Sequence, residues 1–186
     1  DCGLSDLGIM NCTNLTALDA SDNQKITKIS HLPNLIKLVA TLNCGINDQS
    51  LENCNLLKEL NITANKNVKT INHLTNLQVL VAAGVHTIDN SQIEFLTNLT
   101  SLNICYNSAI TNVNSLINLI KLDICGVSRV SDDGIMNCTN LTDLNIAGNS
   151  RVTRLNHFKK LKWLNRTPFS NNVHKNDNQD RNNYEK

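Results

Sequence analysis

The sequence predicts an α/β solenoid, an arc in which eight parallel strands line the concave face and short helices or 3₁₀ turns line the convex face. The first observation behind this prediction is a verbatim repetition, because the nine residues GIMNCTNLT stand at 8–16 and again at 134–142. A catalytic motif is normally needed once in a fold, so such a repetition indicates an architecture built from copies. The second observation is a Leu-x-x-Leu pair that recurs with a spacing alternating between 20 and 22 residues, so that the repeating unit is a 42-residue pair. These pairs are Leu15/Leu18, Leu35/Leu38, Leu57/Leu60, Leu77/Leu80, Leu99/Leu102, Leu119/Leu122, Leu141/Leu144 and Leu161/Leu164.

Each copy continues as Leu-x-x-Leu-x-(Ala/Ile)-x-x-(Asn/Val), as in LTALDASDN at 15–23 and LTSLNICYN at 99–107. The alternation around the second Leu has the period of two that is typical of a short strand with one buried face. An Asn follows the strand in five copies, where its amide can bond to a turn that has no ladder of its own. We expect these side chains to stack into an internal hydrogen-bonded column, interrupted by Val85 and Val127. The five are Asn23, Asn43, Asn65, Asn107 and Asn149.

The two kinds of spacer predict different local structures. Short spacers such as QKITKISHLPN at 24–34 keep apolar residues about every three positions, which suits 3₁₀ or extended turns. Long spacers such as CGINDQSLENCN at 44–55 place Ser or Asp before an Ile/Leu-x-x-Cys/Leu pair. That pattern indicates a short N-capped helix whose Cys faces inward.

These residues resemble the leucine-rich repeat consensus L-x-x-L-x-L-x-x-N over about residues 1–169. The long units resemble the cysteine-containing subclass of these repeats. The resemblance implies a right-handed solenoid, but it does not specify an activity. The paired repeats and abundant Asn, Ile and Lys also resemble arrays encoded by large DNA viruses and some protists.

The two ends of the predicted 1–169 repeat domain differ. The chain starts inside a long spacer, so we expect this domain to be incomplete or uncapped at its N-terminus. At the other end, Trp163, Pro168 and Phe169 stand where a last repeat closes its core. Residues 170–186 contain almost no apolar side chains and predict a polar tail.

The composition argues against a general polyanion binder and against a membrane protein. The net charge is +1, and there is no run of about 18 apolar residues. The charge is uneven, however, and a basic segment without acids among its members lies near the C-terminus. This basic cluster consists of Arg151, Arg154, Lys159, Lys160, Lys162 and Arg166.

The seven cysteines predict buried, reduced thiols. Cys12, Cys54 and Cys138 share one position of the 42-residue unit, and two strand spacings of about 4.8 Å put even Cys12 and Cys54 roughly 10 Å apart, too far for a disulfide. Cys105 and Cys125 are the exception, because they follow neighbouring strands at the same position. A disulfide or metal pair is conceivable there, but no third or fourth ligand is expected beside it.

The other candidate sites do not predict chemistry. His31, His73 and His157 recur on the convex side about 10 Å or more apart, too far to share one metal. The sequence contains no catalytic triad pattern, HExxH helix or glycine-rich phosphate loop. We therefore expect no enzyme activity and no cofactor or metal. The Asn-x-Ser/Thr sequons follow from the repeated NLT and NCT. The odd number of cysteines and their unbridgeable spacing favour a reducing, cytoplasmic location, or the host cytoplasm if the chain is viral.

The concave face is the best functional candidate, because such a solenoid displays its strand side chains next to one another on a rigid backbone. Trp163 is its one large aromatic residue, for which capping the core is an equally good interpretation. Val39, Val79 and Val81 are expected to form an apolar spot, for which cross-strand packing is the simpler explanation. The candidate partner-binding residues are Lys37, Val39, Glu59, Val79, Val81, Asn103, Lys121, Asp123, Asp143 and Trp163.

The sequence thus favours a non-catalytic module, expected to be a monomer, that binds a protein partner on its concave face. One alternative is phosphate or nucleic-acid binding by the segment Arg151–Arg166, which the scarcity of aromatic residues opposes. A second alternative is a structural or adaptor array within a larger chain.

Overall fold

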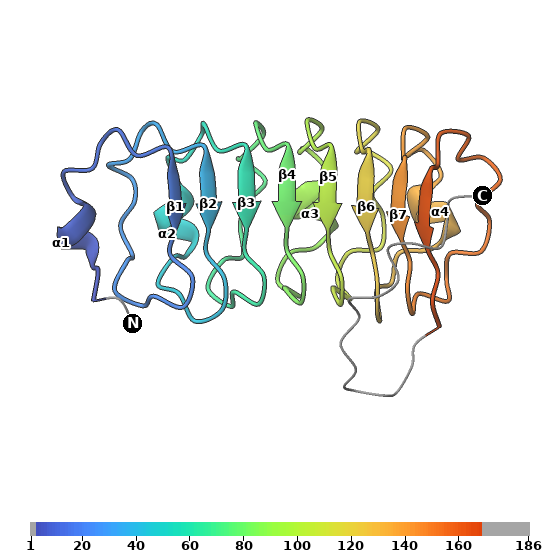
Figure 1. Ribbon diagram of the computed structural model, residues 1–186, viewed down its shortest axis with the longest axis horizontal. Helices are drawn as coiled ribbons and strands as arrows, with labels where there is room; N and C mark the ends of the chain where they lie inside the picture. Colours follow the sequence, from blue (N-terminus) through green and yellow to red (C-terminus); the bar gives the residue numbers. More distant parts are fainter. Residues whose placement is uncertain (1–2, 169–186) are drawn as a thin grey trace.

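The molecule is built on one sheet of short parallel strands, and each strand comes from one repeat (Figure 1). The computed structural model describes residues 3–168. Within this range the sheet has eight strands in the order of the chain. The strands are β1 (Ala17–Asp19), β2 (Lys37–Val39), β3 (Glu59–Asn61), β4 (Val79–Val81), β5 (Ser101–Asn103), β6 (Lys121–Asp123), β7 (Asp143–Asn145) and β8 (Trp163–Asn165).

The leucines of the repeat set the register of the sheet. The second Leu of each pair is the middle residue of its strand and lies opposite its counterparts, as Leu38 does with Leu18 and Leu60. Leu38, Leu80 and Leu122 are buried, whereas the residues on either side of them are turned toward solvent. Because strand side chains alternate between faces, one row of leucines fills the core while the two flanking rows cover the concave surface.

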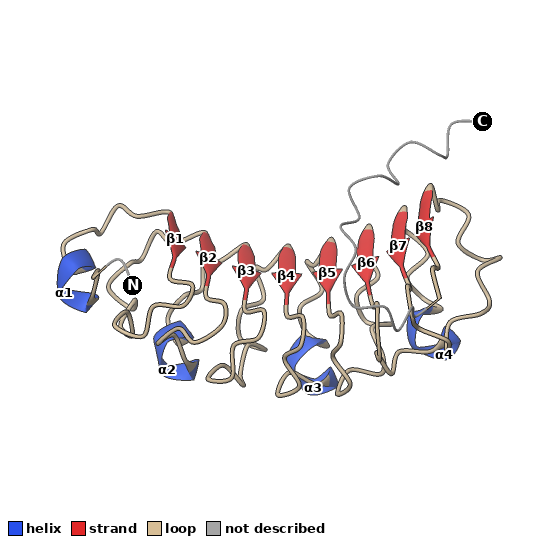
Figure 2. Cartoon of the chain, turned by 60° about the horizontal axis from the view of Figure 1, so that its bottom comes forward, coloured by secondary structure: helices blue, strands red, loops and turns tan. Residues whose placement is uncertain are grey.

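Each long spacer between 3 and 168 contains one helical turn on the side opposite the strands (Figure 2). Asn47 caps α2 through a reciprocal pair of hydrogen bonds with Ser50, and Asp89 caps α3 by accepting from the Ser91 amide. A helix of four residues is not stable alone, so these turns depend on the inward packing of residues such as Ile93. The helices are α1 (Asp6–Ile9), α2 (Asp48–Leu51), α3 (Asn90–Ile93) and α4 (Asp132–Ile135).

A left-handed residue stands three positions after the end of each of the strands β1–β7. It is a glycine in three of these places, Gly84, Gly126 and Gly148, where the absence of Cβ removes the steric cost. Elsewhere residues with side chains take the same conformation, among them Asp22 and Tyr106. The chain therefore leaves every one of these strands through the same sharp turn.

The predicted asparagine column is only partly correct. Asn43 is exposed, and the inward position of that repeat is taken one residue later by the buried Cys44. The asparagines that do point inward recur every 42 residues, so they lie two repeats apart and cannot bond to one another. They are Asn23, Asn65, Asn107 and Asn149.

Each of these asparagines bonds to backbone instead. Asn107 Nδ2 donates to the carbonyls of Val85 and Ile88 at 2.7 and 2.9 Å, and its Oδ1 accepts from the amides of Ala109 and Ile110 at 2.8 and 2.9 Å. One side chain thus satisfies the turn of its own repeat and two carbonyls of the preceding repeat.

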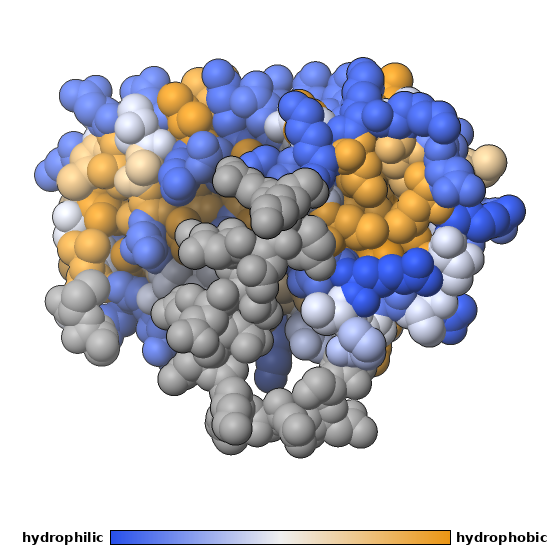
Figure 3. Space-filling model, turned by 45° about the vertical axis from the view of Figure 1, so that its right-hand side comes forward, coloured by the Kyte–Doolittle hydropathy of each residue, from blue (hydrophilic) through white to orange (hydrophobic). Residues whose placement is uncertain are grey.

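The last repeat is more open than the others. Leu164 is 37% exposed, although its counterparts in the interior repeats are buried. Arg166 stands where those repeats have Ala40, Ala82 or Ile124. With this end turned forward, Figure 3 shows apolar surface framed by hydrophilic residues. Phe169, Cys2 and the predicted tail 170–186 lie outside the described residues.

Candidate functional site

The concave face consists of two rows of side chains that the register brings next to one another. The row before the central leucines runs through Lys37, Glu59 and Val79 to Lys121, and the row after them runs from Val39 to Asp123 and beyond. All ten predicted partner-binding residues lie in these rows, because the strands that carry them start at the predicted spacing.

Part of this face is hollowed where the sheet runs from β4 to β8. The hollow has a volume of about 440 Å³. It brings together six of the ten predicted residues and leaves Lys37, Val39, Glu59 and Val79 outside. The lining residues are Val81, Ser101, Leu102, Asn103, Lys121, Leu122, Asp123, Asp143, Asn145 and Trp163.

Trp163 belongs to the concave face and not to the core. It is 48% exposed and lies opposite Asp143 in the register of β7 and β8. Among the described residues at this end of the solenoid, the buried aromatic is Phe158. The interpretation of Trp163 as a core cap is therefore wrong, and a large aromatic surface faces the hollow.

The region outside the hollow differs from the prediction. Asn61 lies between Val39 and Val81 in the second row, so the three valines do not form one apolar spot. Lys37 and Glu59, opposite each other on β2 and β3, form an ion pair at 2.9 Å. In this half of the concave face Lys37 and Glu59 therefore neutralise each other.

Two cysteines at the edge of the concave face contradict the expectation of reduced thiols. Cys105 and Cys125 are joined as a disulfide, with Cα atoms 4.6 Å apart. The expectation that no third ligand stands beside them is also wrong, because Asp123 Oδ1 lies 2.6 Å from Cys105 Sγ. Burial raises the pKa of the Asp123 carboxyl, although hydrogen bonds from Cys125 and Asn145 act in the opposite direction. One basis for a reducing compartment, that the cysteines cannot be bridged, does not hold for this pair.

The remaining described cysteines mostly follow the prediction. Cys44, Cys54 and Cys138 are free and buried, and burial raises the pKa of the Cys54 thiol to about 11 and that of Cys138 to about 12. Such thiols stay protonated and unreactive at neutral pH. Cys12 is exposed, contrary to the expectation, because no preceding repeat covers it in the described residues.

The basic cluster is partly neutralised by acids from the preceding long spacer. Arg154 pairs with Asp132 at 3.2 Å and with Asp133 at 2.8 Å. Lys160 donates to Asn140 at 2.6 Å, while Arg151, Lys159, Lys162 and Arg166 are exposed. The segment is therefore not the acid-free surface that the sequence indicated.

The Asp132 carboxylate also links two repeats through hydrogen bonds. It accepts from the amides of Thr153 and Arg154 and from the Thr153 hydroxyl at 2.7–2.8 Å. Burial acts to raise the pKa of Asp132, but these bonds and the one from the Arg154 side chain outweigh it and hold the pKa well below its ordinary value. Asp6, Asp48 and Asn90 occupy the same helix position and accept from the next spacer in the same way.

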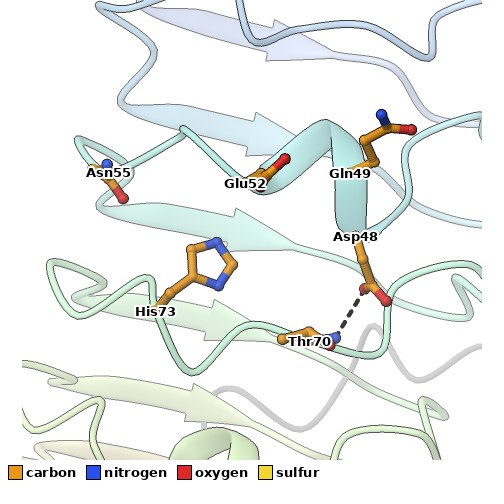
Figure 4. A pocket seen from close by; sticks show the side chains of 6 residues that line it. All are labelled: Asp48, Gln49, Glu52, Asn55, Thr70 and His73. Carbon is orange, nitrogen blue, oxygen red and sulfur yellow. Dashed lines mark hydrogen bonds between the residues drawn. The ribbon is translucent and has the colours of Figure 1, made fainter.

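Two further pockets lie beside the helices and have a common origin. One lies between α2 and the following short spacer, where Asp48 accepts from the Thr70 amide and His73 faces Glu52 (Figure 4). The other is formed by the residues 84 positions later, including Asp132 and His157. A hollow that recurs with the repeat, lined by different side chains each time, is a product of the architecture.

Two of the three predicted histidines cap helices, whereas the buried Nε2 of His157 has no hydrogen-bond partner and its ring packs against Phe158. His31 Nε2 donates to the Ile9 carbonyl and His73 Nε2 to the Leu51 carbonyl, both at 3.1 Å. Each carbonyl belongs to the last residue of a helix, where backbone acceptors lack partners within the helix. His31 and His73 are therefore structural, and the concave hollow remains the best candidate site.

The comparisons with known proteins agree with this geometry. No family model matches the chain, and no curated protein matches it. Among solved structures, the chain is similar to an internalin (inlF) from Listeria monocytogenes, with 25% identity, a TM-score of 0.67, and coverage of 89% of this chain and 51% of that one. It is also similar to an internalin C2 (inlC2) from the same species, with 22% identity, a TM-score of 0.57, and coverage of 82% and 80%.

The chain thus spans about half the length of inlF. None of the described helices is long and apolar enough to cross a membrane. The parallel solenoid of strands with short helices matches the fold of the internalin repeat domains. Over residues 3–168 the chain is an internalin-like leucine-rich repeat solenoid with eight parallel strands and short helices.

Proposed function

We propose that the chain is a non-catalytic module that binds a protein partner in the concave hollow between β4 and β8. The observation that carries this proposal is the half-exposed Trp163 beside Asp143 and Lys121 in that hollow. Aromatic residues in concave, partly desolvated positions are the usual centres of protein interfaces. The internalin-like fold supports the proposal, because repeat solenoids use extended concave surfaces for binding.

The charges of the hollow favour a partner with a basic group next to an apolar one. Asp123 and Asp143 give the hollow two carboxylates, against one ammonium group from Lys121. Val81 and the ring of Trp163 supply apolar surface within the same volume. An arginine or lysine of the partner can lie over the indole while its charge faces a carboxylate.

The test is affinity capture with identification by mass spectrometry, using the parent chain and folded variants. Trp163→Ala and Asp143→Lys should each lose the partner. Phe95→Ala is the matched control, because Phe95 is 60% exposed and directly follows Glu94, the C-cap residue of α3, away from the strands. A partner retained by both hollow variants, or lost equally from the control, would contradict the proposal.

Trp163 also provides a direct measurement, because it is the only tryptophan of the chain. Titration with a captured partner that lacks tryptophan should shift the emission of Trp163 as the indole is buried. The same titration of Asp143→Lys should produce no shift at concentrations that saturate the parent. An unchanged emission at saturation would place the interface elsewhere and leave the structural-array alternative as the better account.

A further inference from the structure

The cluster formed by Cys105, Cys125 and Asp123 has the composition of a metal site. In the register of β5 and β6, Asn103 lies opposite Asp123, and two residues later Cys105 meets Cys125. The two sulfurs and a carboxylate oxygen of Asp123 all lie within 4.8 Å of one another. Cys105 is only 6% exposed, and the other two residues are half-buried.

The carboxylate is held in place by its surroundings. The Cys125 amide donates to Asp123 Oδ1 at 3.2 Å, and Asn103 Nδ2 lies 3.4 Å from Asp123 Oδ2 as a long hydrogen bond. The same turn recurs in other repeats, where Asn61 accepts from the amide of Thr63. At β6 alone among the strands of the described range, this position combines an acid with a pair of neighbouring cysteines.

The spacing suits two thiolates on one cation. Thiolates on a tetrahedral Zn²⁺ lie about 3.8 Å apart, given Zn–S bonds of about 2.3 Å. That separation is smaller than the 4.6 Å between the Cα atoms and larger than a disulfide bond, so a small side-chain rotation reaches it. Asp123 also lines the concave hollow, which gives the fourth coordination position access to water.

We propose that Cys105, Cys125 and Asp123 form a binding site for a thiophilic divalent cation, of which Zn²⁺ is the biological representative, when the two cysteines are reduced. Two thiolates and one carboxylate suit Zn²⁺ and Cd²⁺, whereas Mg²⁺ and Ca²⁺ require oxygen ligands. The disulfide and the metal site are alternative states of one pair, because a disulfide sulfur has no negative charge to offer.

A dithiol reductant converts the disulfide state into the dithiol state that can bind the cation. The reductant supplies two electrons and two protons, its own sulfurs join, the bond between Cys105 and Cys125 breaks, and each of these sulfurs becomes a thiol. Binding of the cation then displaces the two thiol protons to solvent. This site requires no protein partner, so it stands or fails independently of the proposed function.

The experiment measures Cd²⁺ binding by the ultraviolet thiolate-to-metal absorption, and Zn²⁺ by competition. The chain is used with Cys2→Ser and Cys12→Ser as background, so that the exposed thiol of Cys12 and the N-terminal Cys2 do not contribute. Cys44, Cys54 and Cys138 remain, and their burial keeps them out of reach of the cation. The reduced background chain should bind one Cd²⁺ per chain, and the oxidised chain none.

Variants of the cluster then assign the ligands. Cys105→Ser and Cys125→Ser should each abolish stoichiometric binding, and Asp123→Asn should weaken it by about 10-fold or more. Far-ultraviolet circular dichroism shows whether each variant is folded. Binding that survives in both cysteine variants, no binding by the reduced background chain, or an unchanged affinity in Asp123→Asn would overturn the proposed site.

Discussion

The buried Asn107 provides the sharpest test of how the repeats are held together. It is fully buried and makes four hydrogen bonds to backbone groups, two as donor and two as acceptor. In Asn107→Ala the Ile88 carbonyl and the amides of Ala109 and Ile110 lose their partner, while the Val85 carbonyl keeps the Ile88 amide. Leaving a buried polar group unsatisfied costs about 1–3 kcal/mol, so even the lower figure gives a loss of about 3 kcal/mol for three groups.

Asn43 is the matched control, because it holds the same place in the repeat consensus but is exposed. Asn43→Ala should change the free energy of unfolding by less than about 0.5 kcal/mol. The assay is urea denaturation followed by circular dichroism, with equal m-values required before the midpoints are compared. If Asn107→Ala cost less than about 1 kcal/mol, or if both variants cost the same, the hydrogen bonds of Asn107 would not have the proposed role.

Three further predictions concern packing, pH and a surface ion pair. Gly134→Ala should lower the free energy of unfolding, measured by urea denaturation, by about 1–3 kcal/mol, because the new Cβ would lie 2.3 Å from a backbone oxygen. In Gly8→Ala the new Cβ meets only a flexible side chain, so this control should be nearly neutral. Equal losses of stability in the two variants would refute this reasoning. The pKa of Asp132 is lowered in the folded chain. Its contribution to folding stability is therefore complete above the ordinary carboxyl pKa of 3.8 and is lost as the pH falls through the folded-state pKa. Between about pH 5 and pH 2 the melting temperature of Asp132→Asn should therefore fall less than that of the parent. If the melting temperatures of both proteins fell in parallel with pH, Asp132 would not have this role. In a double-mutant cycle the exposed pair Lys37–Glu59 should show a coupling below about 1 kcal/mol, and a larger value would show that the pair is not solvent-screened.

The scaffold could be predicted well from the sequence because the same pattern of buried leucines recurs in every repeat. A leucine at the centre of each strand, such as Leu38 or Leu80, must be buried, and its spacing then fixes the order and register of the sheet. The helices followed for a similar reason, since the long spacers carry residues such as Asn47 that can cap a turn.

The details that depend on local backbone direction could not be predicted in this way. Asn43 and Asn23 hold the same consensus position, yet only Asn23 points inward, because the turn after β2 rotates Cys44 into that place. The sequence placed Cys105 and Cys125 side by side but counted Asp123 only as a surface residue. Contact between a carboxylate and a sulfur depends on how side chains lean from the strand, which periodicity does not encode.

The carboxylates and amides that begin the helices have a consequence for the length of the array. Asp6, Asp48, Asn90 and Asp132 each reach the spacer of the next repeat, and the inward asparagines bridge in the other direction once per 42 residues. A chain shortened by one complete 42-residue pair would keep every junction between a long and a short unit. A chain shortened by 20 or 22 residues would bring two units of the same kind together. Gene duplication or deletion can therefore change the reach of this protein in steps of two strands without rebuilding any contact between repeats.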